Sequence, residues 1–157
     1  MEIDERTFRT TIGLFATGVT VVSAEADTKI YGMTANSVTS VSLNPPLLLV
    51  CVDRRAHMAR AITEAGRFAV SILRDDQEAV SRCFAGQAGP AIQPTFTALG
   101  SAHRLDDCMA AIACVTDQVL DGGDHIIVLA HVEALWKAEE IGSALLYFGG
   151  RYRQVAP

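Results

Sequence analysis

Small polar side chains between Thr34 and Ser42 are the residues of this sequence best suited to hold a ligand. The nine residues contain six hydroxyl or amide groups and no charge. Such groups donate and accept hydrogen bonds, so they suit a flat ring with donors and acceptors along one edge, such as the isoalloxazine of a flavin. A polar turn at the end of a strand has the same composition, and the stretch alone leaves both interpretations open.

A second candidate is His125, which follows the turn-like segment Asp121–Asp124. An imidazole titrates near neutral pH and can position a substrate or stabilise developing charge. Asp124 would then orient the ring; alternatively, His125 only closes the turn by bonding Asp124. No spacing predicts a Ser-His-Asp triad, and acidic pairs such as Asp75-Asp76 are explained by helix capping.

Composition and cysteine spacing exclude several functional classes. The net charge of −5 argues against nucleic-acid binding, which needs a positive surface. No apolar run approaches the ~20 residues of a membrane-spanning helix. The acidic start, residues 1–6, lacks the pattern of a signal peptide, so we expect a cytoplasmic protein. The four cysteines show no C-x-x-C spacing and no histidine pair has zinc-finger spacing, so we expect buried reduced thiols and no metal.

The order of elements predicts a mainly β fold in a single domain over residues 1–157. Strands are expected over 19–23, 30–37, 47–52 (buried on both faces) and 68–73, and in a hairpin formed by 111–120 and 125–135. Helices are expected from a cap at Asp4 to a stop at Gly18, over 56–65, and from a cap at Asp75 through Phe84. About six or seven strands with two or three helices favour a β-barrel with helical additions. The G-x-G-x-x-G and P-loop motifs are absent.

Nearly the whole chain resembles the flavin reductase family, the small components of two-component flavin-dependent monooxygenases. The segments that carry the resemblance, in the family's order, are 15–22, 32–37, 40–47, 66–73, 83–86, 123–125 and 146–152. The resemblance implies a Greek-key split β-barrel, also called the FMN-binding split barrel, and a homodimer with the flavin near the subunit interface. It implies NAD(P)H:flavin oxidoreductase activity with FMN or FAD as flavin, NADH or NADPH as hydride donor, and a partner monooxygenase that uses the reduced flavin.

The resemblance also implies which residues hold the flavin. Those that match positions around the isoalloxazine ring are Thr34, Ala35, Asn36 and Ser37, with Ser40 just beyond them. Those that match the strand end beside the ribityl and phosphate portion are Cys51, Val52 and Asp53. The next segment, Arg54–His57, departs from the serine and threonine of many relatives. Here Arg55 and His57 are expected to hold phosphate in place of hydroxyl groups.

Four further residues receive roles from the resemblance. Phe84 matches an aromatic near the adenine of FAD-using relatives, although its spacing is more typical of a core residue. His125 matches a Gly-Asp-His segment, which implies that it positions the nicotinamide or stabilises charge on the flavin. Tyr147 and Arg151 match a C-terminal segment near both rings, and each also fits a purely structural role. Trp136 is assigned to packing or to the dimer interface.

Two other functions stay open at the level of the sequence. The altered segment Arg54–His57 is compatible with an enzyme that uses tightly bound flavin to oxidise or reduce a specific small molecule. The chain is also compatible with a flavin carrier or redox sensor without turnover, because one scaffold hosts several functions.

Overall fold

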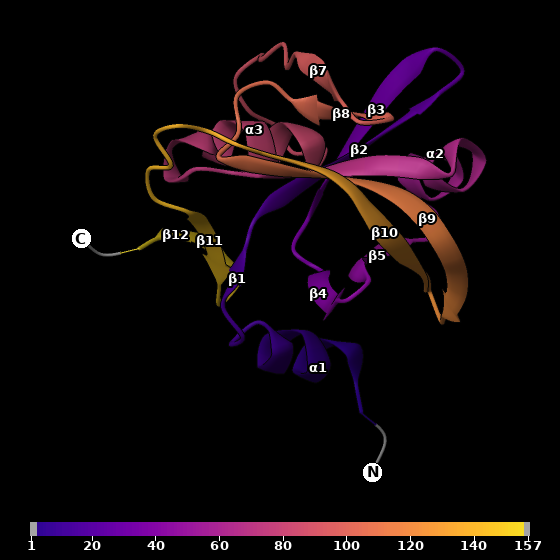
Figure 1. Cartoon of the computed structure of the whole chain (residues 1–157). Helices are drawn as coiled ribbons and strands as arrows, with labels where there is room; N and C mark the ends of the chain where they lie inside the picture. Colours follow the sequence, from indigo (N-terminus) through magenta and orange to yellow (C-terminus); the bar gives the residue numbers. More distant parts are fainter. Residues whose placement is uncertain (1–2, 156–157) are drawn as a thin grey trace.

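Strands dominate the structure, a computed structural model that describes residues 3–155 (Figure 1). The helices in this range are α1 (Glu5–Ile12), α2 (His57–Ala65) and α3 (Glu78–Phe84), with a 3₁₀ turn, η1 (Asp75–Gln77), before α3. The strands are β1 (Thr17–Gly18), β2 (Thr20–Ala26), β3 (Lys29–Ala35), β4 (Val38–Leu43), β5 (Pro46–Asp53), β6 (Arg67–Ile72), β7 (Phe96–Leu99), β8 (Ala102–Leu105), β9 (Ala110–Gly122), β10 (His125–Lys137), β11 (Leu145–Phe148) and β12 (Arg151–Gln154). The mainly β class is confirmed, whereas the expected number of strands was too low. None of the helices in this range is long and apolar enough to cross a membrane.

The central sheet has seven antiparallel strands in the order β3-β2-β6-β9-β10-β5-β4. β3 and β4 are therefore its two edges, although only Asn36 and Ser37 separate them in the chain. A two-residue link spans at most about 10 Å between the Cα atoms of Ala35 and Val38. The sheet must therefore curl until its edges approach each other at this point, which we call the edge link. Among the described strands β3 and β4 do not pair, so the curled sheet is not closed.

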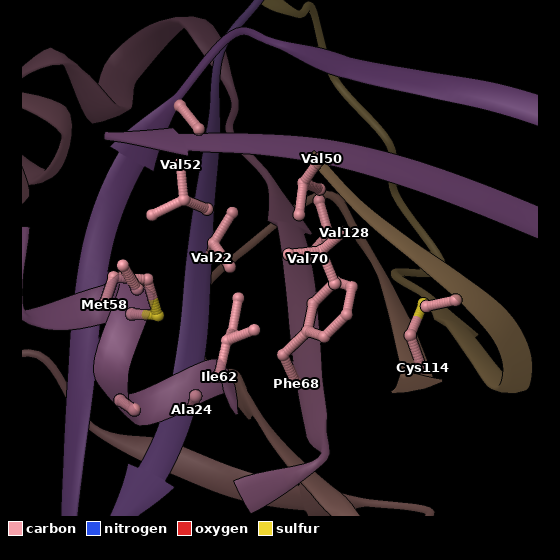
Figure 2. Packing of buried hydrophobic residues seen from close by; sticks show 14 of the residues in the cluster. Val22, Ala24, Val50, Val52, Met58, Ile62, Phe68, Val70, Cys114 and Val128 are labelled. Atoms are coloured by element: carbon pink, nitrogen blue, oxygen red, sulfur yellow. The ribbon is translucent and has the colours of Figure 1, made fainter. Parts of the chain in front are cut away.

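Helix α2 covers one face of the curled sheet and forms the main core with it. Met58 and Ile62 of α2 pack against Val22, Val52 and Phe68, as Figure 2 shows. All five side chains are buried, four of them completely. The predicted end of this helix is confirmed, because Gly66 follows it in the left-handed conformation with a φ of 64°.

A second core joins the central sheet to the three-stranded sheet β1-β11-β12. Its buried residues include Val21, Leu73 and Leu145. Trp136 packs against this core, and the Arg104 guanidinium lies 3.7 Å from the centre of its indole ring. The packing role expected for Trp136 is therefore confirmed. This core holds β11 and β12 beside β1, at one end of the central sheet (Figure 1).

The first helix begins as predicted and ends early. The Asp4 carboxylate accepts a hydrogen bond from the Thr7 amide at 2.9 Å, which confirms the cap. The helix stops at Ile12, because Gly13 closes it with a bond from its amide to the Arg9 carbonyl. Gly18, the expected stop, lies instead in β1, where it pairs with Leu146. Helix α1 has no buried residue and stands apart from the central sheet (Figure 1).

The cap expected at Asp75 is also wrong. Gln77 provides the contact instead, because its side-chain oxygen accepts the Arg74 amide at 2.8 Å. Gln77 is buried, so the chain first makes the turn η1 and enters α3 only at Glu78. The side chain of Asp76 pairs with the Arg74 guanidinium at 3.2 Å.

The expectation for β5 was wrong, and β4 was not expected to be a strand. Residues 47–52 form β5 but are not buried on both faces, because alternate side chains, Leu48, Val50 and Val52, face the core and the others are half-buried. This is the usual pattern of an antiparallel strand with one face on a core. The polar stretch beyond the edge link is not a strand exit but a strand, β4, at the edge of the sheet.

The hairpin of β9 and β10 is confirmed, with Gly123 in the left-handed conformation at its tip. The expectation of buried thiols holds for Cys108 and Cys114 only. Cys51 is half-buried and Cys83 is exposed, and all four are free.

Candidate functional site

The edge link is held against β5 by two hydrogen bonds. The Cys51 amide donates to the Ser37 carbonyl at 3.1 Å, and the Ser37 hydroxyl donates to the Cys51 carbonyl at 3.3 Å. Asn36 is exposed, and its side chain forms no hydrogen bond with any other residue of the range 3–155. Its amide therefore keeps both donors and its acceptor free for a ligand.

Two hollows meet at Asn36. The larger one, which we call the apolar groove, has a volume of about 1120 Å³ and lies between the segment Arg9–Gly18 and the sheet. Its walls include Ile12, Phe15, Val38 and Ile72.

The smaller one, the polar hollow, has a volume of about 440 Å³ and lies between the end of β3, α3 and the hairpin β11–β12. The residues that line both hollows are Asn36, Tyr147 and Gly150. A flat ring at this junction would have an apolar surface on one side and hydrogen-bonding groups on the other, which is the usual design of a cofactor site.

The structure brings the predicted ring-binding segment Thr34–Ser37 and two residues of the C-terminal segment to this junction. Thr34, Ala35, Asn36, Tyr147 and Arg151 line the polar hollow, and Ser37 lines the apolar groove. They differ in what they offer. The Thr34 hydroxyl already donates to the Ser81 carbonyl at 2.6 Å, and Ala35 is buried, with its carbonyl bound by the Thr20 hydroxyl at 2.7 Å. Asn36 and Ser37 are the exposed members of the predicted ring-binding segment.

His125 lies in a separate charged cluster at the far end of β5. It pairs across the strands with Asp53, and its Nδ1 lies 2.7 Å from the Asp124 carboxylate. The Asp124 contact predicted from the sequence is therefore present. Hydrogen bonding and the charge of His125 lower the pKa of Asp124. Hydrogen bonds from Arg55 hold the pKa of Asp53 well below its usual range.

Arg55, which is expected to hold phosphate, and its neighbour Arg54 both have acidic partners. Arg55 donates to the two carboxylate oxygens of Asp53 at 3.1 and 2.8 Å. Arg54 donates to the Gly123 carbonyl at 2.7 Å and pairs with Asp121. His57 is exposed at the start of α2, whose N-cap residue provides no side-chain hydrogen bond. The resulting cluster has no clear excess of positive charge for a phosphate group.

The cluster and the junction do not share a hollow in the single chain. Cys51, Asp53, Arg55, His57 and His125 line neither the apolar groove nor the polar hollow. Asp53 lies two residues beyond Cys51 on an extended strand, about 7 Å further along. A ligand as long as a flavin nucleotide would be needed to contact both groups of residues. Burial raises the pKa of the Cys51 thiol between them.

Three predicted residues have surroundings that limit a role in binding. Val52 is completely buried in the main core, so only its backbone groups are available. Ser40 is exposed on β4 and lines neither hollow. The Phe84 ring packs over Gly32 and meets Phe96 edge-to-face with 6.1 Å between the ring centres. This packing agrees with the core role that its spacing favours.

Sequence reasoning did not find several residues of the polar hollow: Arg82, Gln87, Gly150, Tyr152 and Arg153. Arg82 pairs with Glu78 at a spacing of four residues, which is typical of any solvated helix face. Arg153 carried a usable signal, because alternate residues of a strand share a face and Arg151 was already a candidate.

Comparison with known proteins agrees with this arrangement of residues. Residues 12–156 match the flavin reductase like domain. The chain belongs to the flavin reductase family. An NADH-dependent flavin reductase of a Rhodococcus species is 37% identical over 157 residues, which cover 98% of this chain and 88% of the relative. The reductase component of 4-hydroxyphenylacetate 3-monooxygenase from Thermus thermophilus is 40% identical over 148 residues, with coverage of 94% and 95%.

Solved structures of flavin reductases share the fold. The flavin reductase PheA2 in its native state superposes with a TM-score of 0.93 and 39% sequence identity, covering 99% of this chain and all of that one. The split-barrel architecture expected for a flavin reductase is therefore confirmed. Within residues 3–155, no three His, Cys, Asp or Glu side chains come together as they would around a metal ion.

Proposed function

We propose that this chain is an NADH-dependent flavin reductase that supplies reduced flavin to a partner monooxygenase. The observation that carries the proposal is the junction at Asn36, where a free amide stands between an apolar groove and a polar hollow. Relatives named as NADH-dependent flavin, FAD and FMN reductases support the activity. Relatives named as reductase components of monooxygenases support the partner.

The residues at the junction fit a flavin. A bound flavin supplies the redox chemistry, because its ring accepts a hydride from a reduced nicotinamide. The Asn36 amide would hydrogen-bond the polar edge of the ring, and the Ser37 hydroxyl, which donates to the Cys51 carbonyl, would accept a hydrogen bond from it. Ile12, Phe15 and Val38 would contact the apolar face of the ring. The protein's contribution is to bring two rings into close contact, so it needs no strong acid or base.

The activity is tested by following NADH oxidation by the purified protein with and without added FMN, FAD or riboflavin. A rate that depends on added or retained flavin is expected. Retained flavin is identified by the absorbance spectrum of the protein and by release of the flavin after denaturation. Absence of a flavin-dependent rate with both NADH and NADPH would overturn the proposal.

His125 is proposed to position the nicotinamide or to stabilise charge on the flavin, oriented by its contact with Asp124. Replacing His125 by glutamine is expected to lower kcat/KM for NADH about tenfold, because one hydrogen bond to a charged or polarised group is lost. Flavin binding, measured by fluorescence quenching, should change little. Equal losses in NADH turnover and flavin affinity would assign His125 to flavin binding instead.

The homodimer is a further part of the proposal, supported by the exposed apolar surface around α1. Phe8 and Phe15 are 61% and 71% exposed, and Ile12 and Leu14 are also mostly exposed. Exposed apolar patches of this kind mark protein interfaces in soluble proteins. Sedimentation at micromolar concentration is expected to give a dimer, and a monomer there would contradict it.

A further inference from the structure

The polar hollow carries an excess of positive charge in an otherwise acidic protein. Three arginines, Arg82, Arg151 and Arg153, line it together with one carboxylate, that of Glu78. The chain as a whole has a net charge of −5. Concave sites lined by charges of one sign concentrate ligands of the opposite sign. The charge of the hollow therefore points to an anionic ligand group.

The three arginines are not equivalent. Arg82 is fixed by Glu78, whose carboxylate it contacts at 2.6 and 2.8 Å, and by the Gln87 side chain at 2.9 Å. Its guanidinium also lies 5.0 Å from the centre of the Tyr152 ring. Glu78 thus neutralises Arg82 and leaves two positive charges for a ligand.

Arg151 and Arg153 supply those charges. They stand at alternate positions of β12, so they share one face of the strand. Both are exposed, and neither forms an ion pair with any residue of the range 3–155. This contrasts with Arg54 and Arg55, which both have carboxylate partners. Two free guanidiniums on one face suit a group with two adjacent phosphates, since each guanidinium binds phosphate oxygens through paired hydrogen bonds.

The backbone keeps the hollow open beside the arginines. The turn between β11 and β12 consists of Gly149 and Gly150, both in the left-handed conformation with φ values of 58° and 74°. This two-residue turn brings Tyr147 opposite Tyr152, and their rings meet edge-to-face at 5.4 Å. Both tyrosines line the polar hollow together with the arginines and Asn36, and Tyr147 also lines the apolar groove. The volume of about 440 Å³ lies within the range typical of ligand sites.

We propose that the polar hollow binds the diphosphate of an adenine dinucleotide through Arg151 and Arg153. The inference rests on the proposed function, which places two ring systems at the neighbouring junction. Both FAD and NADH carry this diphosphate, and Asn36, the residue proposed to hold the ring, lines the same hollow as the two arginines. A mononucleotide such as FMN has no diphosphate for the two arginines to bind. The hollow should therefore make the protein bind dinucleotides more tightly than mononucleotides.

Four substrate pairs test the proposal, because FMN and reduced nicotinamide mononucleotide each lack the adenosine monophosphate portion and so carry a single phosphate in place of the diphosphate. KM values of the double variant Arg151→Gln/Arg153→Gln and of the parent are measured with FAD and with FMN as the flavin. Each flavin is paired once with NADH and once with reduced nicotinamide mononucleotide as the hydride donor. In the double variant, KM for one of the two dinucleotides, FAD or NADH, should be about tenfold higher or more than in the parent. The KM values for FMN paired with reduced nicotinamide mononucleotide should not change. A rise confined to FAD assigns the hollow to the flavin, and a rise confined to NADH assigns it to the nicotinamide donor. Arg67→Gln, an exposed arginine of β6 that lines neither hollow, is the matched control.

Two further measurements keep the outcomes distinct. ADP should inhibit the parent competitively against the affected dinucleotide, and the double variant should resist this inhibition. Arg151→Lys/Arg153→Lys, which retains both charges, should recover part of the lost affinity. Unchanged KM values for both dinucleotides, or equal changes for FMN with the mononucleotide, would overturn the inference while leaving the flavin reductase activity intact. Absence of turnover with all four pairs in the parent would instead contradict the proposed function.

Discussion

A chain with leucine in place of Asn36 is expected to reduce flavin with a kcat/KM about 30-fold lower than the parent, since a ligand's polar groups left without partners cost about 1–3 kcal/mol. Leucine has the same number and branching of side-chain non-hydrogen atoms as asparagine but neither donates nor accepts a hydrogen bond. Asn36 is the exposed amide at the junction of the two hollows, so the loss should fall on the flavin ring. Steady-state rates over a range of FMN or FAD concentrations measure it.

The stability of this variant should equal that of the parent. The Asn36 side chain forms no hydrogen bond within residues 3–155 and is exposed, so its removal leaves no buried group without a partner. Gln118→Leu on the exposed part of β9 is the matched control, because it also replaces an exposed amide by leucine. A normal kcat/KM for Asn36→Leu would place the flavin ring away from the edge link.

The parts of the fold that sequence predicted well are those fixed by local chemistry. Gly66 ends α2 because a glycine adopts the left-handed conformation easily, and Asp4 begins α1 because its carboxylate binds a free amide. The hairpin of β9 and β10 follows in the same way from the glycines at its tip. These signals act within a few residues, so a single sequence contains them completely.

The parts that sequence missed depend on contacts between distant strands. β4 carries hydroxyl side chains because its outer face is exposed at the edge of the sheet, and its place is set by pairing with β5. Its sequence therefore lacks the apolar alternation by which a half-buried strand is recognised. The local sequence predicts that Gly18 stops a helix, whereas pairing with Leu146 makes it part of a strand.

The same limit applies to the site. Asn36 and Tyr147 are far apart in the sequence, and their meeting at one junction followed only from the family resemblance. The pairing of Asp53 with His125 depends on the register of β5 against β10, which a single sequence does not reveal. The ion pairs of Arg54 with Asp121 and of Arg55 with Asp53 cannot be predicted from the sequence for the same reason. Because of these pairs, both guanidinium groups are bound to carboxylates rather than free to bind phosphate.

The close contact between β3 and α3 leads to the second large expected effect. Gly32→Val should lower the free energy of unfolding by about 1–3 kcal/mol, the range for overfilling a packed site. A Cβ at Gly32 would lie 3.1 Å from Cζ of Phe84 and closer still to Cδ1 and Cε1. The ring has little freedom to withdraw, since it also packs against Phe96. Urea unfolding followed by circular dichroism gives the free-energy difference.

The same substitution should also affect the polar hollow, because Phe84 and Arg82 lie on α3 and the valine would push this helix outward. Gly18→Val is the matched control, since a Cβ there meets no atom within 4 Å. In the double variant Gly32→Val/Phe84→Ala the missing ring leaves room for the valine. The two substitutions together should therefore cost less than the sum of their separate effects, as contacting residues do. Strict additivity, or a Gly32→Val chain as stable as the parent, would show that Phe84 is not packed against β3 and would return it to the candidates for adenine binding.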